Sequence, residues 1–553
     1  MTKTEKDEGS HPQGDVAAEV DPEKRPNSST LTDPGQPAPE YEYITGVKLW
    51  LVFISVTLTV FLLMVDESII VTAIPQITSD FHALSDVGWY GSAYLLSICV
   101  LQPLTGKIYS QFSSKYSFLC FLAVFELGSV LCGAARSSTM LIIGRAVAGM
   151  GGSGLTNGAF TIIGASVPME KRPAMQGIMI SISQSGIVIA PMLGGALAQY
   201  STWRWCFYLN LPIGGVAALF LLLIKLPDRI DRTNNAPRLT IIGLAKKLDI
   251  TGFLIFAPAT VMLLMALQWG GTDYPWSSAT IIGLFCGAGV TLIPFVIWEY
   301  YVGENAMIPI SIVGHRVVWS GCIYAGLFLG AVMTFTYYMP IYFQAVRGIS
   351  PSLSGVYMLP SILSQMIAAA VSGVIAGKIH HYYPFSMVSG VFVAIGSGLL
   401  SMLSPSTPSS KWIGYQILLG IGRGFGIQMP IVAVQNILPP QQNPIGIALI
   451  VFSQTLGGSV FLAFAQTIFS HSLITNLAKY APTVSAHTVQ EAGAAAIRHV
   501  VDPQDLPGVL KAYQQGINDN FYLVAAASAA TFFLAFAMGL NRISKKEGGE
   551  VEE

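Results

Sequence analysis

Residues 49–73 read LWLVFISVTLTVFLLMVDESIIVTA, a run of 25 in which Asp66 and Glu67 are the only charged residues. A helix needs about 20 mostly apolar residues to cross a bilayer, so this run predicts a membrane span. The whole chain has the same character, since 52% of its 553 residues are hydrophobic and 11% are charged. Soluble domains carry roughly a quarter charged residues. We therefore predict an all-α, polytopic membrane protein.

Similar apolar runs recur along the chain and predict its topology. Fourteen spans are expected, near residues 49–73, 87–106, 116–135, 140–165, 176–199, 206–225, 250–268, 280–300, 317–343, 354–377, 385–404, 411–436, 446–470 and 520–540. Without the segments at 250–268 and 280–300 the count would be twelve. Either number makes the lipid bilayer the first expected partner of the chain.

The segment before the first span has a different composition. Residues 1–46 contain ten Asp or Glu, four Lys or Arg and six Pro. A segment with so few apolar residues cannot bury enough surface to fold, so we predict a disordered, acidic cytosolic tail. It has no early apolar region of the kind that marks a cleavable signal peptide, so the first span is expected to stay in the protein.

Basic residues in the loops predict the orientation. With the N-terminus in the cytosol, 20 Lys or Arg fall on the cytosolic side and seven outside, while Arg145 and Arg423 lie inside spans. Cytosolic loops carry the excess of basic residues, so both termini are predicted to be cytosolic. Residues 541–553 would form a cytosolic tail and residues 471–519 the longest outer loop. The plasma membrane is the expected location, with the vacuolar membrane as the alternative.

An internal repeat predicts how the spans are grouped. Gly106-Lys107-Ile108 recurs 271 positions later as Gly377-Lys378-Ile379, and Gly149-Met150-Gly151 recurs at the same offset as Gly420-Ile421-Gly422. Repeated halves that face each other across a cavity at the midplane are the usual design of secondary transporters.

The repeat divides the chain into two six-helix bundles and an insert. The N-terminal bundle is expected at 47–225 and the C-terminal bundle at 317–540. Residues 226–316 would then form a cytosolic linker and two inserted spans.

Several functions find no support in the sequence. The net charge of −1 gives no basic surface for nucleic acid. The phosphate-binding pattern Gly-x-x-x-x-Gly-Lys is absent, which argues against direct use of ATP. The six Cys and eight His show no metal-ligand spacing. We therefore expect neither an enzyme nor a cofactor or metal site.

Five stretches stand out from the apolar background: Asp66–Pro75, Gly106–Lys115, Gly144–Gly149, Gly186–Gly195 and Trp203–Pro212. Each resembles a motif of the major facilitator superfamily, and together they resemble its fourteen-span drug–proton antiporter branch over residues 45–545. In the second stretch Ser110 stands where that family usually has Asp. Within the branch, Gly414-Tyr415-Gln416 and the run Gly422–Gln435 look most like fungal exporters of toxins and other secondary metabolites. The resemblance implies exchange of protons for a small organic molecule.

Asp66 and Arg145 are the first candidates for proton coupling. An ionisable residue inside a span is costly and is therefore a functional candidate. The two residues enter spans 1 and 4 at about the same depth, so they can pair. An Asp that is balanced between burial and a nearby Arg can take up and release a proton as the cavity changes sides. The alternative is a permanent ion pair that only orients two helices.

Two further acidic residues are candidates for the same role. Glu67 neighbours Asp66 on a different face of the helix, and we expect only one of the two to be central. Glu126 sits near the middle of span 3. It is either a second protonation site or a neutral Glu that is hydrogen-bonded to a neighbouring helix.

Span 5 contains the stretch that resembles the antiporter motif, with Gly186, Pro191, Gly194 and Gly195. Gly186, Ala190 and Gly194 follow at intervals of four residues and form a stripe of small residues, which lets helices approach closely. Pro191 removes a backbone hydrogen bond and permits a kink. Such a helix could seal one side of the cavity, although small stripes also occur in ordinary helix packing.

Polar residues inside spans are the candidates for lining a substrate cavity, because unsatisfied polar groups should face protein or water rather than lipid. The candidates are Asn157, Gln184, Tyr337, Tyr338, Gln416, Arg423 and Gln428. Taken alone, each is more typical of a residue that forms a hydrogen bond between helices than of a ligand contact.

The sequence thus predicts a proton-driven exporter of small organic compounds, with a small-molecule substrate and protons as its partners. Proton-coupled uptake, for example of a siderophore, uses the same scaffold and is the main alternative. A transporter-like sensor is the third possibility, but the tails of 46 and 13 residues are short for that role.

Overall fold

The computed structural model describes residues 43–83, 86–226, 241–486, 489, 497–498, 500–539 and 542–543. Nearly all of them lie in helices or short turns, and in these ranges β-pairing is limited to two isolated bridges, Gly270 with Tyr274 and His381 with Arg542. The predicted all-α fold is therefore confirmed. The predicted acidic tail lies outside the described residues except for its last four, and of the C-terminal tail at 541–553 only residues 542 and 543 are described.

The N-terminal bundle consists of seven helices. They are α1 (Gly46–Phe81), α2 (Val87–Gln111), α3 (Ser114–Gly133), α4 (Ser138–Ser166), α5 (Arg172–Tyr200), α6 (Trp205–Tyr208) and α7 (Asn210–Leu223). Helix α4 packs against α2 and α3, while α1 packs against α5 and α7. Close approach rests on glycine: a Cβ on Gly128 of α3 would lie 2.3 Å from the backbone nitrogen of Ala148 in α4. Small residues at helix interfaces give membrane bundles their packing contacts.

The C-terminal bundle repeats this arrangement. Its helices are α12 (Arg316–Ile341), α13 (Pro351–Tyr357), α14 (Leu359–Ile379), α15 (Tyr383–Leu400), α16 (Ser409–Gly426), α17 (Met429–Ile437), α18 (Asn443–Tyr480) and α20 (Leu506–Ala537). Helix α12 packs against α18 and α20, and α15 against α16 and α20. Helix α18 runs to Tyr480 and α20 starts at Leu506, so both extend into the stretch predicted as the long outer loop. A single π-helical turn, Tyr342–Val346, follows α12.

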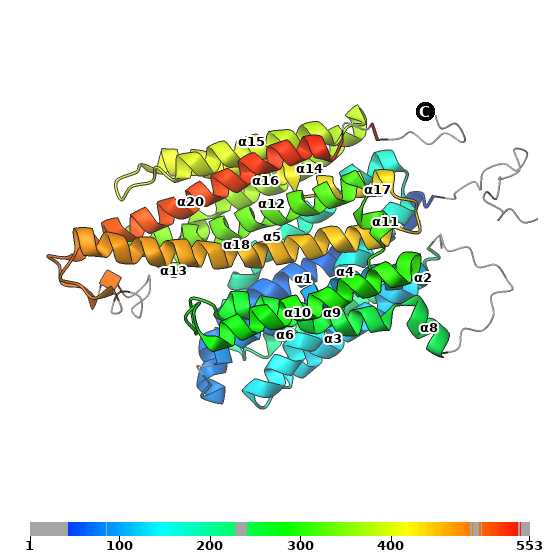
Figure 1. The fold of residues 1–553 in the computed structure, drawn as a ribbon, viewed down its shortest axis with the longest axis horizontal. Helices are drawn as coiled ribbons and strands as arrows, with labels where there is room; N and C mark the ends of the chain where they lie inside the picture. Colours follow the sequence, from blue (N-terminus) through cyan, green and yellow to red (C-terminus); the bar gives the residue numbers. More distant parts are fainter. Residues whose placement is uncertain are drawn as a thin grey trace, which may run out of the picture. The chain divides into compact units, whose positions relative to one another are not determined.

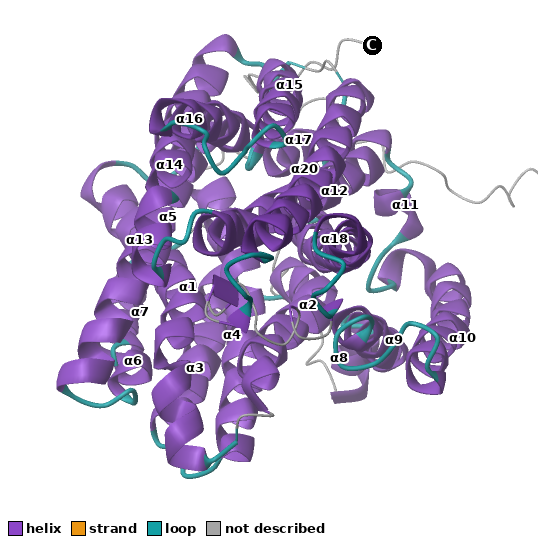
Figure 2. Ribbon diagram, turned by 90° about the vertical axis from the view of Figure 1, so that its left-hand side faces the viewer, coloured by secondary structure: helices purple, strands orange, loops and turns teal. Residues whose placement is uncertain are grey.

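The insert between the bundles is a helical hairpin. Its parts are α8 (Ile241–Lys247), α9 (Ile250–Trp269), α10 (Ala279–Val302) and α11 (Ile310–Val313). Helices α9 and α10 pack against each other, and α9 contacts both α2 and α18. Figures 1 and 2 show the hairpin beside these two helices, on one side of the bundles. One helix of the insert thus touches both bundles.

Buried polar side chains hold the base of this hairpin. Asp249, directly before α9, accepts hydrogen bonds from Trp298 Nε1 at 2.8 Å and from the backbone N–H of Met307 at 2.9 Å. Lys107, near the end of α2, donates to the carbonyl oxygen of Ala306 at 2.7 Å. The two bonds to Asp249 thus hold the insert together, and the bond from Lys107 joins it to the N-terminal bundle.

Among the described residues, twelve helical segments are long and apolar enough to cross a membrane. All fourteen predicted spans correspond to helices, but α2 and α4 are not among these twelve segments. Composition alone therefore supports a multi-pass membrane protein without fixing the number of spans at fourteen. The segments at 250–268 and 280–300, on which the smaller predicted count depended, are among the twelve, as α9 and α10.

Candidate functional site

An enclosed ion pair joins α1 and α4 inside the N-terminal bundle. Arg145 Nη1 lies 2.6 Å from Asp66 Oδ2, and each side chain is 1% exposed. Arg145 also donates through Nε to the carbonyl oxygen of Tyr90 at 3.0 Å, and its Cζ lies 4.3 Å from the ring centre of Tyr94. A charge inside a bundle is costly unless a partner compensates it, and this pair compensates both charges.

A third helix completes the shell of the carboxylate. Asn210, the first residue of α7, donates its side-chain amide to Asp66 Oδ1 at 3.0 Å. The same nitrogen lies 3.0 Å from Ser129 Oγ of α3. Both oxygens of Asp66 are therefore bound, one by a cation and one by a neutral amide. We call Asp66, Arg145, Asn210 and Ser129 the Asp66 centre.

A short hydrogen-bonded chain continues from this centre toward the predicted outer end. Tyr90, whose carbonyl oxygen binds Arg145, has its hydroxyl 3.0 Å from Ser138 Oγ. Ser138 donates to Asp86 Oδ2 at 2.5 Å. Asp86 directly precedes α2. Tyr90 thus contacts the enclosed pair through its backbone, and its hydroxyl belongs to a polar group at the end of the bundle where α2 and α4 begin.

The other two acidic candidates lie in different surroundings. The side chain of Glu67 is exposed and forms no hydrogen bond with any described residue. Both carboxylate oxygens of Glu126 are enclosed and find no hydrogen-bond partner in the described part of the chain. Glu126 lies directly against Gly214 of α7, one turn after Asn210. It therefore stands beside the Asp66 centre without being bonded to it.

The small residues of α5 face α1, the helix that carries Asp66. A Cβ on Gly194 would lie 2.3 Å from Thr72 Oγ1, and one on Gly186 would lie 3.0 Å from a carbonyl oxygen of α1. Gly195 has open space where its Cβ would be, and the side chain of Pro191 is exposed. Two of the four motif residues thus make the α1–α5 contact, and the other two point away from it.

Helix α5 also contacts the C-terminal bundle, where it meets α14. A Cβ on Gly177 would lie 2.4 Å from the carbonyl oxygen of Ala369, and one on Gly373 would lie 2.3 Å from that of Pro173. We call this contact between α5 and α14 the α5–α14 seam. Gln428 lies in it and donates to the Ala369 carbonyl at 3.3 Å. These residues belong to the half of α5 that follows the span 4–5 loop. The seam therefore lies at the predicted cytosolic end.

A second seam joins α2 to α18 at the same end. A Cβ on Gly106 would lie 2.8 Å from Cα of Ile445. Between the two seams, Gln435 of α17 accepts a hydrogen bond from Gln176 of α5 at 2.8 Å. Gln435 also donates to the carbonyl oxygen of Phe160 in α4 at 3.2 Å. Backbone and side chains of both bundles are thus in direct contact here.

The hydrophobic core shows the same difference between the two ends. One cluster of buried apolar side chains contains residues of both bundles, among them Ile163 and Val434. Toward the predicted outer end, the cluster around Ile69 belongs to the N-terminal bundle alone, and the cluster around Phe335 to the C-terminal bundle alone. Of these three clusters, the one at the predicted cytosolic end is shared by the bundles, and each of the two toward the outer end belongs to one bundle.

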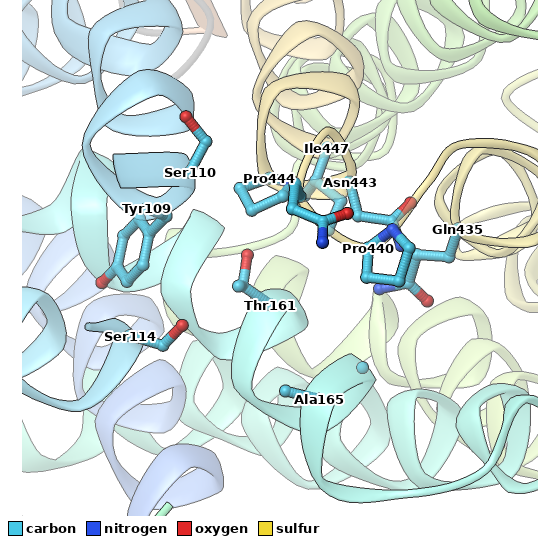
Figure 3. A pocket seen from close by; sticks show the side chains of 12 residues that line it. Tyr109, Ser110, Ser114, Thr161, Ala165, Gln435, Pro440, Asn443, Pro444 and Ile447 are labelled. Atoms are coloured by element: carbon cyan, nitrogen blue, oxygen red, sulfur yellow. The ribbon is translucent and has the colours of Figure 1, made fainter. Parts of the chain in front are cut away.

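We call the predicted cytosolic end, where the two bundles are in contact, the closed end. A small cavity lies within it (Figure 3). It contains about 490 Å³ of space between atoms, part of it open to solvent, and its lining includes Ser110, Thr161, Gln435 and Asn443. All twelve lining residues are uncharged. The cavity is thus a gap between α2, α3, α4, α17 and α18 that is lined by uncharged, largely polar residues.

The residues predicted to line a substrate cavity lie at several places. Asn157 of α4 is buried and donates to Thr105 Oγ1 at 3.1 Å, while Gln184 of α5 is half-buried. Tyr337 is 54% exposed, whereas Tyr338 is buried and its hydroxyl donates to a glutamine of α18 at 2.9 Å. The two tyrosines are thus neighbours with different surroundings.

Helix α16 carries two more of these residues. Gln416 donates to the carbonyl oxygen of Tyr357 at 3.0 Å. The Cζ atom of Arg423 lies 5.4 Å from the ring centre of Phe335 in α12. Gln428, the seventh candidate, is the residue described in the α5–α14 seam. The structure does not bring all seven residues into one constellation.

The family model described as Major Facilitator Superfamily matches residues 56–462, which is more than half of the chain. The chain belongs to the Major Facilitator Superfamily. The superfamily match includes the Asp66 centre and both seams, and it confirms the resemblance seen in the sequence.

Relatives in this superfamily match over nearly the whole chain. Efflux pump mlcE of Penicillium citrinum is 55% identical over 511 residues, which cover 91% of this chain and 92% of that protein. Efflux pump mokI of Monascus pilosus is 54% identical over 505 residues, covering 90% and 93%. The MFS-type transporter pigP of Monascus ruber is 50% identical over 535 residues, covering 97% and 93%.

Solved structures of the superfamily share the fold. The proton:xylose symporter XylE has a TM-score of 0.57 at 12% identity, covering 88% of this chain and 95% of that one. The bacterial homologue of the lysosomal transporter Spinster, in an inward-facing conformation, has a TM-score of 0.54 at 16% identity, covering 91% and 100%. At such identities the likeness concerns the fold alone.

Sequence reasoning missed part of the Asp66 centre. Asn210 lies in the stretch that resembles a superfamily motif, but no role was predicted for it. Ser129 gave no signal, because serine is common in membrane helices. An asparagine at the start of an apolar run, where a buried amide needs partners, was the available signal for Asn210.

Proposed function

We propose that this superfamily member is a proton-driven efflux transporter that exports small organic compounds, such as toxins, secondary metabolites or drugs, by alternating access. Two relatives that are more than 50% identical over nine-tenths of the chain are named efflux pumps. The observation that carries proton coupling is the enclosed Asp66–Arg145 pair, with Asn210 on the second carboxylate oxygen.

The geometry suggests how a proton acts on this pair. A proton on Asp66 removes its negative charge, so the Coulombic attraction to Arg145 is lost and only a neutral hydrogen bond remains. Arg145 keeps the Tyr90 carbonyl and the Tyr94 ring as partners in that state. Helix α1 is then held less firmly to α4. Reforming the ion pair expels the proton.

A change at α1 can reach the closed end through α5. Helix α5 packs on α1 along Gly186 and Gly194, and its other part forms the seam with α14 at Gly177. One helix thus touches both the helix that carries Asp66 and the contact that must open for alternating access. This agrees with the sealing role proposed for the span 5 motif.

The two bundles are in contact at the predicted cytosolic end, so the state seen here would face outward. In that state substrate leaves to the outside and a proton enters from there. Asp86, Ser138 and the Tyr90 hydroxyl form a hydrogen-bonded group on that side, at the end of the bundle from which a proton would enter. Glu126, enclosed beside the Asp66 centre, is the second candidate for holding the proton, and the exposed Glu67 is the third.

The proposal includes a complete topology. Helices α2 and α4 have 25 and 29 residues and pack against each other within the bundle, so we count them with the twelve apolar segments as spans. Fourteen spans with both termini in the cytosol of a plasma-membrane protein agree with the distribution of basic residues.

The test is Asp66→Asn in proteoliposomes, with Asp80→Asn as the matched control. Both changes lie on α1 and keep a hydrogen-bonding side chain, but Asp80 lies near the end of the helix, where it accepts from Trp203 Nε1 at 2.7 Å. The probes are fluorescent organic dyes that are anionic, neutral or cationic. Their movement is measured with and without an imposed pH gradient and is normalised to inserted protein.

We expect the unchanged protein and Asp80→Asn to move at least one dye against its gradient when the pH gradient is present. Asp66→Asn should insert normally, lose gradient-driven movement and keep passive exchange. Gradient-driven efflux by Asp66→Asn at the level of the unchanged protein would exclude Asp66 and direct attention to Glu126 and Glu67. Movement only in the direction of proton entry, as symport, would overturn the export proposal.

A further inference from the structure

Arg423 is a buried cation without a counter-charge in the described structure. The residue is 6% exposed and lies in α16, inside the C-terminal bundle. Its side chain forms no ion pair or hydrogen bond with any described residue, and the side-chain Nε atom is enclosed without a partner. The ring of Phe335, at 5.4 Å from Cζ, is its one recorded charge-related contact there.

The other intramembrane arginine, Arg145, has the partners that Arg423 lacks in the described structure. Arg145 has the Asp66 carboxylate at 2.6 Å, a backbone carbonyl oxygen and the Tyr94 ring. Of these three kinds of partner, Arg423 has only the ring among the residues that the structure describes. A guanidinium stays protonated in proteins, so Arg423 cannot escape the cost of its burial by losing a proton.

The sequence around Arg423 contains no acidic residue that could pair with it. No Asp or Glu occurs between Glu304 and Glu491, a stretch of 186 residues that contains six Lys or Arg. Further along the chain, Asp519 of α20 accepts from Ser472 Oγ at 2.5 Å and from a glutamine of its own helix at 3.2 Å. The C-terminal bundle thus holds an intramembrane positive charge that its own span sequences do not neutralise.

We propose that Arg423 binds the anionic group of the substrate, so that the preferred substrates are organic anions, above all carboxylates on an apolar body. The inference rests on the proposed transport function. A carboxylate matches the guanidinium because two oxygens can accept two parallel N–H groups. The apolar body is implied by the neighbouring rings, since Phe335 lies 6.3 Å from Phe521 between ring centres.

The two bundles then have separate tasks. The N-terminal bundle contains a cation that is already paired with Asp66, while the C-terminal bundle offers a cation to a ligand. A carboxylate that enters the transporter supplies the missing counter-charge and releases it on leaving. A small inorganic anion could supply the same charge, so the experiment must separate the two sources.

The test measures equilibrium binding to purified full-length protein in nanodiscs, without a pH gradient. The probes are 1-naphthaleneacetate and 4-phenylbutyrate, each with its neutral primary amide, at pH 7, where the carboxylates are ionised. Chloride and inorganic phosphate are added separately as competitors. The variants are Arg423→Gln and Arg423→Lys. The matched control is Arg347→Gln, since Arg347 is an arginine of the same bundle that donates to the carbonyl oxygen of Thr407 at 2.6 Å.

We expect the unchanged protein and Arg347→Gln to bind an acid about 10- to 100-fold more tightly than its amide, the range for a charge-assisted hydrogen bond. Arg423→Gln should lose this preference while still binding the amide, and Arg423→Lys should keep part of it. Equal binding of acid and amide, a preference that survives Arg423→Gln, or no binding of either acid would overturn the inference. Binding of chloride or phosphate that excludes the acids completely would assign the site to inorganic anions and overturn it too.

The result of this binding experiment does not depend on the proposed direction of transport or on its coupling to protons. Dyes that move with the proton gradient while acid and amide bind equally would leave the efflux proposal intact and remove this inference. A clear preference for the acid without gradient-driven movement of any dye would support this inference and remove the efflux proposal.

Discussion

Replacing Gly177 by Ala should weaken the closed end of the transporter. The new Cβ would lie 2.4 Å from the carbonyl oxygen of Ala369 and 2.9 Å from Gln428 Nε2, whereas ordinary contacts begin near 3.4 Å. Helices α5 and α14 must therefore separate by about 1 Å at this point. Overpacking of this kind costs about 1 to 3 kcal/mol. Since the cost falls on the closed state alone, the population should shift about 5- to 150-fold toward a state open at this end.

The shift can be measured as a distance between spin labels. Lys171 and Lys378 are exposed and flank the point where a Cβ on Gly377 would lie 2.5 Å from the Glu170 carbonyl oxygen. Labels at these two positions, with the exposed Cys120 and Cys286 replaced by Ser, report the separation of the bundles. Gly177→Ala should populate longer distances at the expense of the shortest ones.

Gly195→Ala is the control for this experiment. It lies in the same helix and changes the same atoms, but nothing stands within 4 Å of the new Cβ. It should give the distance distribution of the unchanged protein. An unaltered distribution in Gly177→Ala, at normal membrane abundance, would show that the α5–α14 seam does not hold the closed state.

Two further predictions concern buried hydrogen bonds. Asn210→Leu removes the amide that binds Asp66 and Ser129, which should cost about 1.5 to 3 kcal/mol for the bond to the charged group and lower the thermal unfolding temperature of the purified protein; an unchanged temperature would contradict the role given to the amide. Lys107→Met leaves the carbonyl of Ala306 without its donor and should speed amide hydrogen exchange at 303–308, while equal exchange rates would show that this contact does not hold the hairpin.

The sequence predicted the helices well because each span depends on its own composition. The run at 49–73 lies within α1, and the segments at 250–268 and 280–300 lie within α9 and α10. Helix ends were less predictable. Span 13 was expected at 446–470, but α18 continues to Tyr480. Its last ten residues can be helical outside a bilayer as well as inside, so apolar composition does not mark where they end.

The site was predictable only where depth along the helix axis was enough to define it. Asp66 and Arg145 could be paired because both are charged and enter their spans at the same depth. Asn210 and Ser129 depend on which helices lie side by side and at what rotation, which a span pattern does not contain. For the same reason, Gln428 could not be placed in the α5–α14 seam in advance. The proposed roles of all these residues remain predictions.

The inserted hairpin contacts the N-terminal bundle through a directional hydrogen bond and the C-terminal bundle through apolar rings. This difference decides which of the two bundles it can slide along. Its base is fixed to α2 by the bond from Lys107 to the Ala306 carbonyl, whereas it meets α18 through rings, with Phe256 and Phe452 5.5 Å apart between centres. Apolar contact has little directional preference, so one ring can slide past another at small cost. When the two bundles move relative to each other, α9 should therefore move with the N-terminal bundle and slide along α18.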